Sequence, residues 1–254
     1  MNITLLGSGN VATHLGLALK AAGHDIIQVW SRSEVNAVAL AEKLGAQPIS
    51  AISALNRSAE LYLIAVKDDA IAELVSALPF PDLTIVHTSG STSLSALAGV
   101  SSRIGVLYPI QTLSKDKSVN FKEIPIAIEA NTESVANMLQ TLAESISSKV
   151  IQLSSEQRVT LHMAAVFACN FTNYFYTVAQ DILAKEHLHF DLLRPLIIET
   201  AQKVLAHDPS QMQTGPARRH DQHTVNKHLE LLKADAVYAK LYDSLSTLIM
   251  DRYK

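Results

Sequence analysis

The first residues whose types and spacing suggest chemistry form the glycine turn Gly7-Ser8-Gly9-Asn10-Val11-Ala12. An apolar run, Ile3-Thr4-Leu5-Leu6, precedes the turn, and a helical pattern follows it. Gly7 permits a sharp bend, Gly9 lets a pyrophosphate reach the backbone, and Ala12 lets the helix lie close to a sheet. The free N–H groups and the dipole of that helix attract an anion. An ordinary tight turn is the alternative, but a strand before it and a helix after it favour a dinucleotide held by Gly7, Ser8, Gly9, Asn10 and Val11.

The residues after the second expected strand, Asp25–Trp30, indicate which dinucleotide is bound. NAD sites place a carboxylate here, which accepts hydrogen bonds from the adenosine ribose. This chain has Ser31, Arg32 and Ser33 instead, and Glu34 comes later. A guanidinium between two hydroxyl groups suits a 2′-phosphate. The sequence therefore predicts NADP rather than NAD, with a solvated Arg32 at the start of a surface helix as the alternative.

A third candidate segment, Ala65-Val66-Lys67, ends another strand-like run. In an open α/β sheet, ligands bind at the carboxyl ends of the strands. Ala65 and Val66 would lie beneath the ribose that joins the pyrophosphate to the nicotinamide. Lys67 could reach a phosphate or that ribose, or it could be a surface lysine beside a helix cap.

Two polar segments also begin where strands are expected to stop, namely His87-Thr88-Ser89-Gly90-Ser91 and Tyr108-Pro109-Ile110-Gln111-Thr112. His87 could act as a general acid or base near neutral pH. Ser89 and neighbouring N–H groups could hold a substrate carboxylate. The alternative is that His87 hydrogen-bonds to the chain and fixes the loop. Tyr108 is a weaker catalytic candidate than His87.

A polar line crosses an otherwise apolar helical pattern in the second half of the chain. His162, Asn170 and Asn173 recur, with Val166 between them, at intervals of three or four residues. Such residues share one face of a helix. Because buried polar groups need partners, this line could serve catalysis, or its members could pair with one another or with a facing subunit.

A later turn, Thr214-Gly215-Pro216-Ala217-Arg218-Arg219-His220-Asp221, contains two guanidinium groups. Arg218 or Arg219 could hold a substrate carboxylate, or both could belong to a charged helix entry. Histidines also stand at 220, 223 and 228, and the first two have a spacing that suits a metal. No cysteine or clear carboxylate set completes a site, so we expect no metal.

Strands and helices must position these residues, and the hydrophobic pattern predicts both. Apolar runs alternate with helical patterns up to residue 153, which predicts an α/β fold of Rossmann type with a mainly parallel sheet. No strand pattern follows, and helices are expected at about 155–185, 190–205, 224–233 and 236–253. We therefore expect an NADP-binding domain at residues 1–153 and a helical domain at residues 154–254.

Composition limits the functional classes. The 254-residue chain has a formal net charge of −3, which gives no reason to expect a nucleic acid or an acidic membrane surface as partner. One cysteine, Cys169, excludes an internal disulfide and fits a reducing compartment. The chain enters a strand without a signal-peptide pattern, so a cytoplasmic protein is expected. Polar residues interrupt the uncharged stretch Leu161–Gln180, which favours a buried helix over a membrane span.

The first long helix of the second half predicts an oligomer. It is apolar nearly all round between Met163 and Ala179. A helix of this composition must be covered on every side, and a domain of roughly a hundred residues can hardly do so alone. We therefore expect a homodimer that forms through the helical domain.

The N-terminal half resembles the cofactor domain of pyrroline-5-carboxylate reductases, through Gly7-Ser8-Gly9-Asn10, Ser31-Arg32-Ser33 and Ala65-Val66-Lys67. The whole chain is more similar to a family of candidate NADP oxidoreductases whose C-terminal half is a domain of unknown function. The residues that carry this resemblance are His87-Thr88-Ser89-Gly90, Tyr108-Pro109-Ile110-Gln111-Thr112, His162 to Asn170, and Thr214-Gly215-Pro216-Ala217-Arg218 with Asp221. It implies a Rossmann domain and a helical domain like that of 6-phosphogluconate dehydrogenases, usually dimeric. Related β-hydroxyacid dehydrogenases have a lysine where this chain has Val166, four residues before Asn170.

Two hypotheses follow. The first is an NADP(H)-dependent oxidoreductase that acts on a small, carboxylate-bearing metabolite as substrate. His87 or His162 would then donate the proton, Asn170 would belong to the catalytic group, and Arg218 would hold the carboxylate. The second is a regulatory or redox-sensing protein that binds NADP(H) without turnover, which the absence of an obvious lysine or Tyr–Lys arrangement favours.

Overall fold

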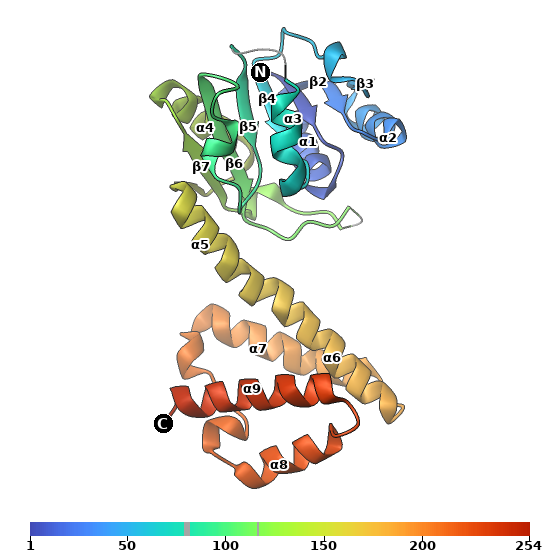
Figure 1. Cartoon of the computed structure of the whole chain (residues 1–254), viewed down its shortest axis with the longest axis vertical. Coiled ribbons are helices and arrows are strands. Elements are labelled where there is room, and N and C mark those ends of the chain that lie inside the picture. The colour runs from blue at the N-terminus through green and yellow to red at the C-terminus, as the bar shows by residue number, and fades with distance from the viewer. Residues whose placement is uncertain (79–81, 116) are drawn as a thin grey trace. The chain divides into compact units, whose positions relative to one another are not determined.

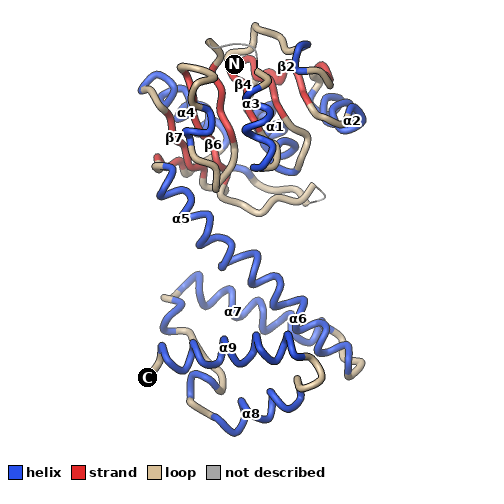
Figure 2. Tube along the Cα trace, in the orientation of Figure 1, coloured by secondary structure: helices blue, strands red, loops and turns tan. Residues whose placement is uncertain are grey.

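A computed structural model describes residues 1–78, 82–115 and 117–254 of the chain. It divides the chain into two compact units, Met1–Cys169 and Asn170–Lys254 (Figure 1). Within the described part, strands occur only in the first unit, and the second unit is built from helices and turns (Figure 2).

The first unit contains one sheet, in which the described residues form eight strands. Their order across the sheet is β3-β2-β1-β4-β5-β6-β7-β8. Neighbouring strands are parallel except for β6 and β7, which are antiparallel. The bounds are β1 (Asn2–Leu6), β2 (Asp25–Trp30), β3 (Gln47–Ile49), β4 (Leu61–Ile64), β5 (Thr84–His87), β6 (Arg103–Pro109), β7 (Ile126–Ala130) and β8 (Val150–Gln152).

Both faces of the sheet are covered, which explains why its central strands read as apolar runs. On one face, Leu5 and Leu63 share a core with Leu15 of α1 (Asn10–Ala21), and α2 (Glu34–Leu44) and α4 (Glu133–Ile146) add to the same core. On the other face, Leu6 and Ile64 pack with residues of α3 (Ile71–Ser76). The prediction of a Rossmann-type, mainly parallel α/β fold is therefore confirmed.

The antiparallel step between β6 and β7 has a local cause. A parallel connection needs a crossover, usually a helix, on one face of the sheet. Only the short 3₁₀ turn Phe121–Glu123 forms among the described residues between these two strands. The chain therefore returns beside β6 in the opposite direction, and β7 and β8 extend the sheet from there.

The long helix predicted at 155–185 is divided in the structure. It consists of α5 (Ser155–Ala165), a π-helical segment (Val166–Phe171) and α6 (Thr172–Lys185). The limits of the compact units fall inside the π-helical segment, whereas the last strand ends at Gln152. The domain limits 1–153 and 154–254 stay a prediction.

The second unit continues with α7 (Arg194–Ala206), α8 (Gln222–Leu231) and α9 (Ala236–Arg252). Few of its described residues are buried, namely Ala217, Val225 and Ser246. Across the described parts of the chain, no helix is both long enough and apolar enough to cross a bilayer.

Gly7 makes the turn after β1 possible, and a side chain there should be costly. Its φ is +136°, and an added Cβ would lie 2.1 Å from the carbonyl oxygen of Ala65. We expect Gly7→Ala to lower the free energy of unfolding by about 3 kcal/mol or more, from backbone strain and overlap with the neighbouring strand. Urea unfolding followed by circular dichroism measures this loss.

Gly9→Ala is the matched control, because a Cβ at Gly9 would meet nothing within 4 Å. Its free energy of unfolding should stay within about 1 kcal/mol of the wild type. Equal stability of Gly7→Ala and Gly9→Ala would contradict the close approach of Gly7 to Ala65.

Candidate functional site

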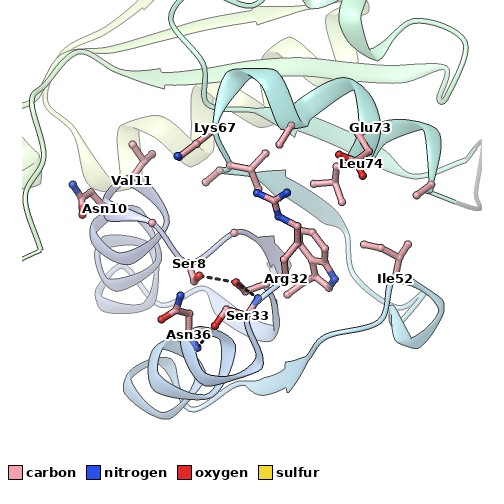
Figure 3. A pocket seen from close by; sticks show the side chains of 18 residues that line it. Ser8, Asn10, Val11, Arg32, Ser33, Asn36, Ile52, Lys67, Glu73 and Leu74 are labelled. Atoms are coloured by element: carbon pink, nitrogen blue, oxygen red, sulfur yellow. Dashed lines mark hydrogen bonds between the residues drawn. The ribbon is translucent and has the colours of Figure 1, made fainter.

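A cavity of about 740 Å³ lies at the carboxyl ends of β1, β2 and β4 (Figure 3). This is the edge of an open α/β sheet at which ligands bind. All of the residues predicted to hold the cofactor line the cavity: Gly7, Ser8, Gly9, Asn10, Val11, Ser31, Arg32, Ser33, Ala65, Val66 and Lys67. Residues far apart in the sequence are thus brought to one place.

The start of α1 supplies the anion-binding part of the cavity. Gly9 is the N-cap of α1 but contributes no side-chain cap, and no acidic residue stands in the first turn. The first N–H groups of the helix are therefore not satisfied by a capping side chain, and they attract negative charge. The side chain of Asn10 is bound elsewhere, since it donates a hydrogen bond to the carbonyl oxygen of Leu113 at 2.7 Å.

The carboxyl end of β2 supplies a second part of the cavity. The hydroxyl of Ser8 donates to that of Ser31 at 2.8 Å, which ties the glycine turn to this strand end. Ser33 caps α2 by accepting from the N–H of Asn36. The side chain of Arg32 is exposed and extends into the cavity (Figure 3). It has no ion-pair partner among the residues that the structure describes.

The charges around the cavity favour an anion. Arg32 and Lys67 contribute two positive charges, and Glu73 contributes one negative charge. Both cations are exposed, so they are available to phosphate groups. Trp30, the single tryptophan of the chain, also lines the cavity and is 8% exposed.

The loop after β5 is held firmly against the end of β4. Both the N–H and the hydroxyl of Thr88 donate to the carbonyl oxygen of Ile64, at 3.0 and 3.2 Å. The Ser89 hydroxyl oxygen accepts from the N–H groups of Ser91 and Thr92. The Ser91 hydroxyl in turn donates to the carboxylate of Asp68, which follows β4. Residues 88–92 therefore form an ordered loop beside the cavity-lining segment 65–67.

His87 is completely buried at the base of this loop. Its Nδ1 accepts a hydrogen bond from the N–H of Ser89 at 3.2 Å. Burial, with a smaller contribution from the positive charge of Arg158, lowers the pKa of His87 to about 4. The imidazole is therefore neutral at pH 7 and helps to fix the loop.

Arg158 is a central residue of the site that the sequence analysis missed. It lies in α5, is completely buried, and forms an ion pair with Glu129 of β7 at 2.9 Å. Its guanidinium also donates to the carbonyl oxygens of the loop after β5, at Ser89, Gly90 and Thr92. The sequence did contain one sign of this role, since Arg158 is a lone arginine in the first turns of a helix that was expected to be buried.

Tyr108 and His162 meet beside the same loop. The Tyr108 hydroxyl and His162 Nδ1 are 3.2 Å apart, and the two rings meet edge to face. A Cβ on Gly90 would lie 2.7 Å from atoms of both side chains. Burial raises the pKa of Tyr108, and the negative charge of Asp68 acts in the same direction while Arg158 opposes it. The phenol is therefore protonated at neutral pH.

The other two predicted catalytic residues belong to the second unit. Asn170 is exposed and lies in the π-helical segment. Arg218 is exposed, with its guanidinium carbon 4.6 Å from the centroid of the Tyr253 ring. The structure thus brings His87 and His162 to one loop of the first unit, and it places Asn170 and Arg218 in the second.

Two of the later histidines have partners in the protein. His228 Nδ1 lies 2.7 Å from the Tyr242 hydroxyl, and His220 Nε2 lies 3.4 Å from the carbonyl oxygen of Tyr253. Within the described ranges, no three histidine, cysteine, aspartate or glutamate side chains cluster as metal ligands would.

The fold and the cavity define a Rossmann-type dinucleotide-binding protein, and comparison with known proteins gives its family. Residues 2–89 match a family model described as "NADP oxidoreductase coenzyme F420-dependent", and residues 124–249 match a domain of unknown function, DUF2520. The chain is 42% identical to a candidate NADP oxidoreductase from Bacteroides fragilis, with a TM-score of 0.93 over 98% of both chains. The chain belongs to this family of NADP oxidoreductases, as its sequence motifs predict.

More distant solved structures share the fold. An imine reductase from Myxococcus stipitatus in complex with NADP⁺ is 14% identical, with a TM-score of 0.74 over 99% of this chain and 93% of that one. A 1-pyrroline-5-carboxylate reductase from Streptococcus pyogenes is 16% identical, with a TM-score of 0.64 over 99% and 98%. A search of curated proteins gave no match.

The buried position of His87 predicts a loss of stability in acid. An unfolded histidine takes up its proton near pH 6.5, whereas the folded one does so only at about pH 4. Between these values the unfolded state binds more protons, so stability falls as the pH falls. We expect His87 to remove about 3 kcal/mol of unfolding free energy between pH 6.5 and 4, and to contribute no pH dependence above that window.

Urea unfolding of the wild type and His87→Gln at several pH values from 7.5 to 4.5 measures this contribution. The slope of stability against pH should be shallower in His87→Gln, whatever its stability at pH 7. His207→Gln, which removes an exposed imidazole, is the control. Parallel slopes for wild type and His87→Gln would show that His87 is not held neutral.

Proposed function

We propose that this protein is an NADP(H)-dependent oxidoreductase that transfers hydride to or from a small, carboxylate-bearing metabolite. The observation that carries the proposal is the cavity, in which a free helix N-terminus and an unpaired arginine face the same space among the described residues. The family and the reductase-like neighbours support the same reaction class.

The cavity suggests how NADP would be held. The residues of the glycine turn would bind the pyrophosphate through their backbone N–H groups. Arg32 would bind the 2′-phosphate, with Ser31 and Ser33 beside it. Ala65, Val66 and Lys67 would lie along the ribose that leads to the nicotinamide. The bound cofactor supplies the hydride, while the protein supplies alignment and a proton.

The remaining roles follow from charge and burial. His162 is a better proton donor than His87, because the low pKa of His87 leaves little of its protonated form at neutral pH. His87 would instead hold the loop after β5. Asn170 and Arg218, both exposed, would bind the substrate, with Arg218 on its carboxylate.

The alternative is a sensor that binds NADP(H) without turnover. The polar side chains at the same edge of the sheet as the cavity favour an enzyme over a sensor. The Tyr108 and His162 side chains meet beside the ordered loop after β5, where a sensor would need no proton donor.

Coenzyme titration tests the proposal, with Trp30 as a built-in probe. Binding of NADPH should quench its fluorescence, because the nicotinamide coenzyme would lie in the cavity that Trp30 lines. We expect NADPH to bind more tightly than NADH. Arg32→Ala should weaken NADPH binding by roughly ten- to a hundredfold and leave NADH binding nearly unchanged, because only NADPH has the 2′-phosphate.

Arg103→Ala is the matched control, since Arg103 is exposed at the opposite ends of the strands, at the start of β6. It should bind both coenzymes as the wild type does. Absence of binding by either coenzyme would overturn the proposal. If NADPH binds and a panel of keto acids, imines and lactams gives no turnover, the sensor replaces the enzyme.

We also propose that the protein forms a homodimer through its helical unit. In that unit the structure describes many exposed apolar side chains, among them Leu192, Leu196 and Leu205, which are 66%, 62% and 86% exposed. Burying each leucine would contribute about 1.5–3 kcal/mol. A second copy of the chain, rich in the same side chains, would cover them.

Analytical ultracentrifugation should therefore give twice the 27.6 kDa mass of the chain at micromolar concentration. Leu192→Asp combined with Leu196→Asp should shift the equilibrium toward the monomer. Val35→Asp, which alters an equally exposed side chain of α2 in the first unit, should leave the mass unchanged. A wild-type monomer under these conditions would contradict the homodimer.

A further inference from the structure

The contact between Tyr108 and His162 joins a strand and a helix that are far apart in the sequence. Tyr108 lies near the carboxyl end of β6, and His162 lies in α5. Their hydroxyl oxygen and Nδ1 are 3.2 Å apart, which is hydrogen-bond distance. Both side chains are half-buried, so the pair is shielded from bulk water but can still be reached.

Neighbouring residues fix the pair in position. Gly90 approaches both rings so closely that no side chain fits there. Arg158 lies one turn before His162 in the same helix, and it holds the carbonyl oxygens of Ser89 and Gly90. The loop, the tyrosine and the histidine are therefore aligned by one set of buried contacts. Such rigid support is what a catalytic group requires.

The pair also lies at the edge of the sheet that holds the proposed cofactor site. The carboxyl ends of β4, β5 and β6 are adjacent in the sheet, and β4 leads into the cavity-lining residues Ala65 to Lys67. Thr88 binds the end of β4, and Ser91 binds Asp68 directly after Lys67. A substrate that lies beyond the nicotinamide end of the cavity would therefore meet the loop that contacts Tyr108 and His162.

We propose that Tyr108 and His162 form a two-residue proton relay for the reduction of a C=O or C=N bond, an inference that rests on the proposed function. Hydride from NADPH adds to the substrate carbon, and the Tyr108 hydroxyl gives its proton to the substrate oxygen or nitrogen. His162 Nδ1–H gives its proton to the Tyr108 oxygen in the same step. Tyr108 remains a neutral phenol, and the imidazolium of His162 becomes neutral imidazole and regains a proton from water.

The surroundings explain why two residues are needed. Burial and the carboxylate of Asp68 both disfavour a charged phenolate at Tyr108, and Cys169 adds to this effect. The positive charge of Arg158 opposes it, but Arg158 is paired with Glu129. A tyrosine that donated its proton alone would leave an unfavourable anion, whereas replacement of the proton from His162 avoids it.

The test uses the full-length protein, NADPH and the best substrate of the panel, and it measures single-turnover NADPH oxidation from pH 5 to 9. Tyr108→Phe should reduce the rate about 100-fold or more, because general acid catalysis contributes 10²–10⁴-fold. Its NADPH affinity and melting temperature should match those of the wild type. Because the relay consumes the proton of the His162 imidazolium, the wild-type rate should fall as the pH rises, and His162→Gln should remove this dependence.

Tyr62→Phe and His24→Gln are matched controls, since both residues lie in the first unit and have hydrogen-bond partners outside the site. Both should retain the wild-type rate and pH profile. Gly90→Ala keeps both catalytic groups but displaces them, so it should also slow the reaction.

The outcomes separate the relay from the reaction itself. If the wild type reduces the substrate and the rate of Tyr108→Phe lies within threefold of the wild-type rate, the relay is overturned and the proposed oxidoreductase function stands. The relay would also be overturned if Tyr108→Phe is slow but His162→Gln keeps the wild-type pH profile. A wild type that binds NADPH but reduces no substrate would overturn both the relay and the oxidoreductase.

Discussion

The close backbone approach of Gly7 to Ala65 is the contact on which the candidate site depends. Because β1 pairs in parallel with both β2 and β4, three strands end at the same edge of the sheet. The N–H of Gly7 donates to the carbonyl oxygen of Trp30, and the N–H of Ala65 donates to that of Leu6. These bonds continue the pairing of β1 with β2 and with β4 up to the glycine turn. The space that remains is the cavity, and the start of α1 faces it without a side-chain cap. The anion site is thus a consequence of strand order and of one missing side chain.

The cofactor half of the site could be predicted from the sequence because its information is local. A strand, a glycine turn and a helix follow one another within about twenty residues, as dinucleotide-binding turns require. The residues at the carboxyl ends of β2 and β4 could be assigned to the same site because parallel strands end at a common edge of the sheet. The Rossmann-type fold and the NADP oxidoreductase family agree with this interpretation. The antiparallel direction of β7 could not be foreseen, since it depends on a connection in which the described residues form only a short 3₁₀ turn and no crossover helix.

The polar half of the site depends on contacts between distant residues, and the sequence pattern does not contain them. Tyr108 and His162 are 54 residues apart, and Arg158 and the Ser89 carbonyl are 69 apart. A helical pattern shows which residues share a face, but it does not show which strand that face will meet. His87 illustrates the same limit. Its place at a strand end suggested catalysis, whereas burial and the positive charge of Arg158 lower its pKa and keep it neutral. Residue type and position along a strand do not determine a pKa; the surrounding dielectric and charges do.

The buried Arg158 shows how the two halves are joined. A completely buried charge is costly, and an apolar residue of similar size can often replace a buried ion pair without loss of stability. Here the replacement would remove more than the ion pair with Glu129, because three carbonyl oxygens of the loop after β5 also accept from Arg158. Unsatisfied buried acceptors cost roughly 1–3 kcal/mol each. The guanidinium therefore links α5, β7 and the loop in a single arrangement that an aliphatic side chain could not maintain. His162 lies one turn after Arg158 in α5, and Gly90, which Arg158 holds, approaches both rings, so the buried guanidinium also supports the contact between Tyr108 and His162.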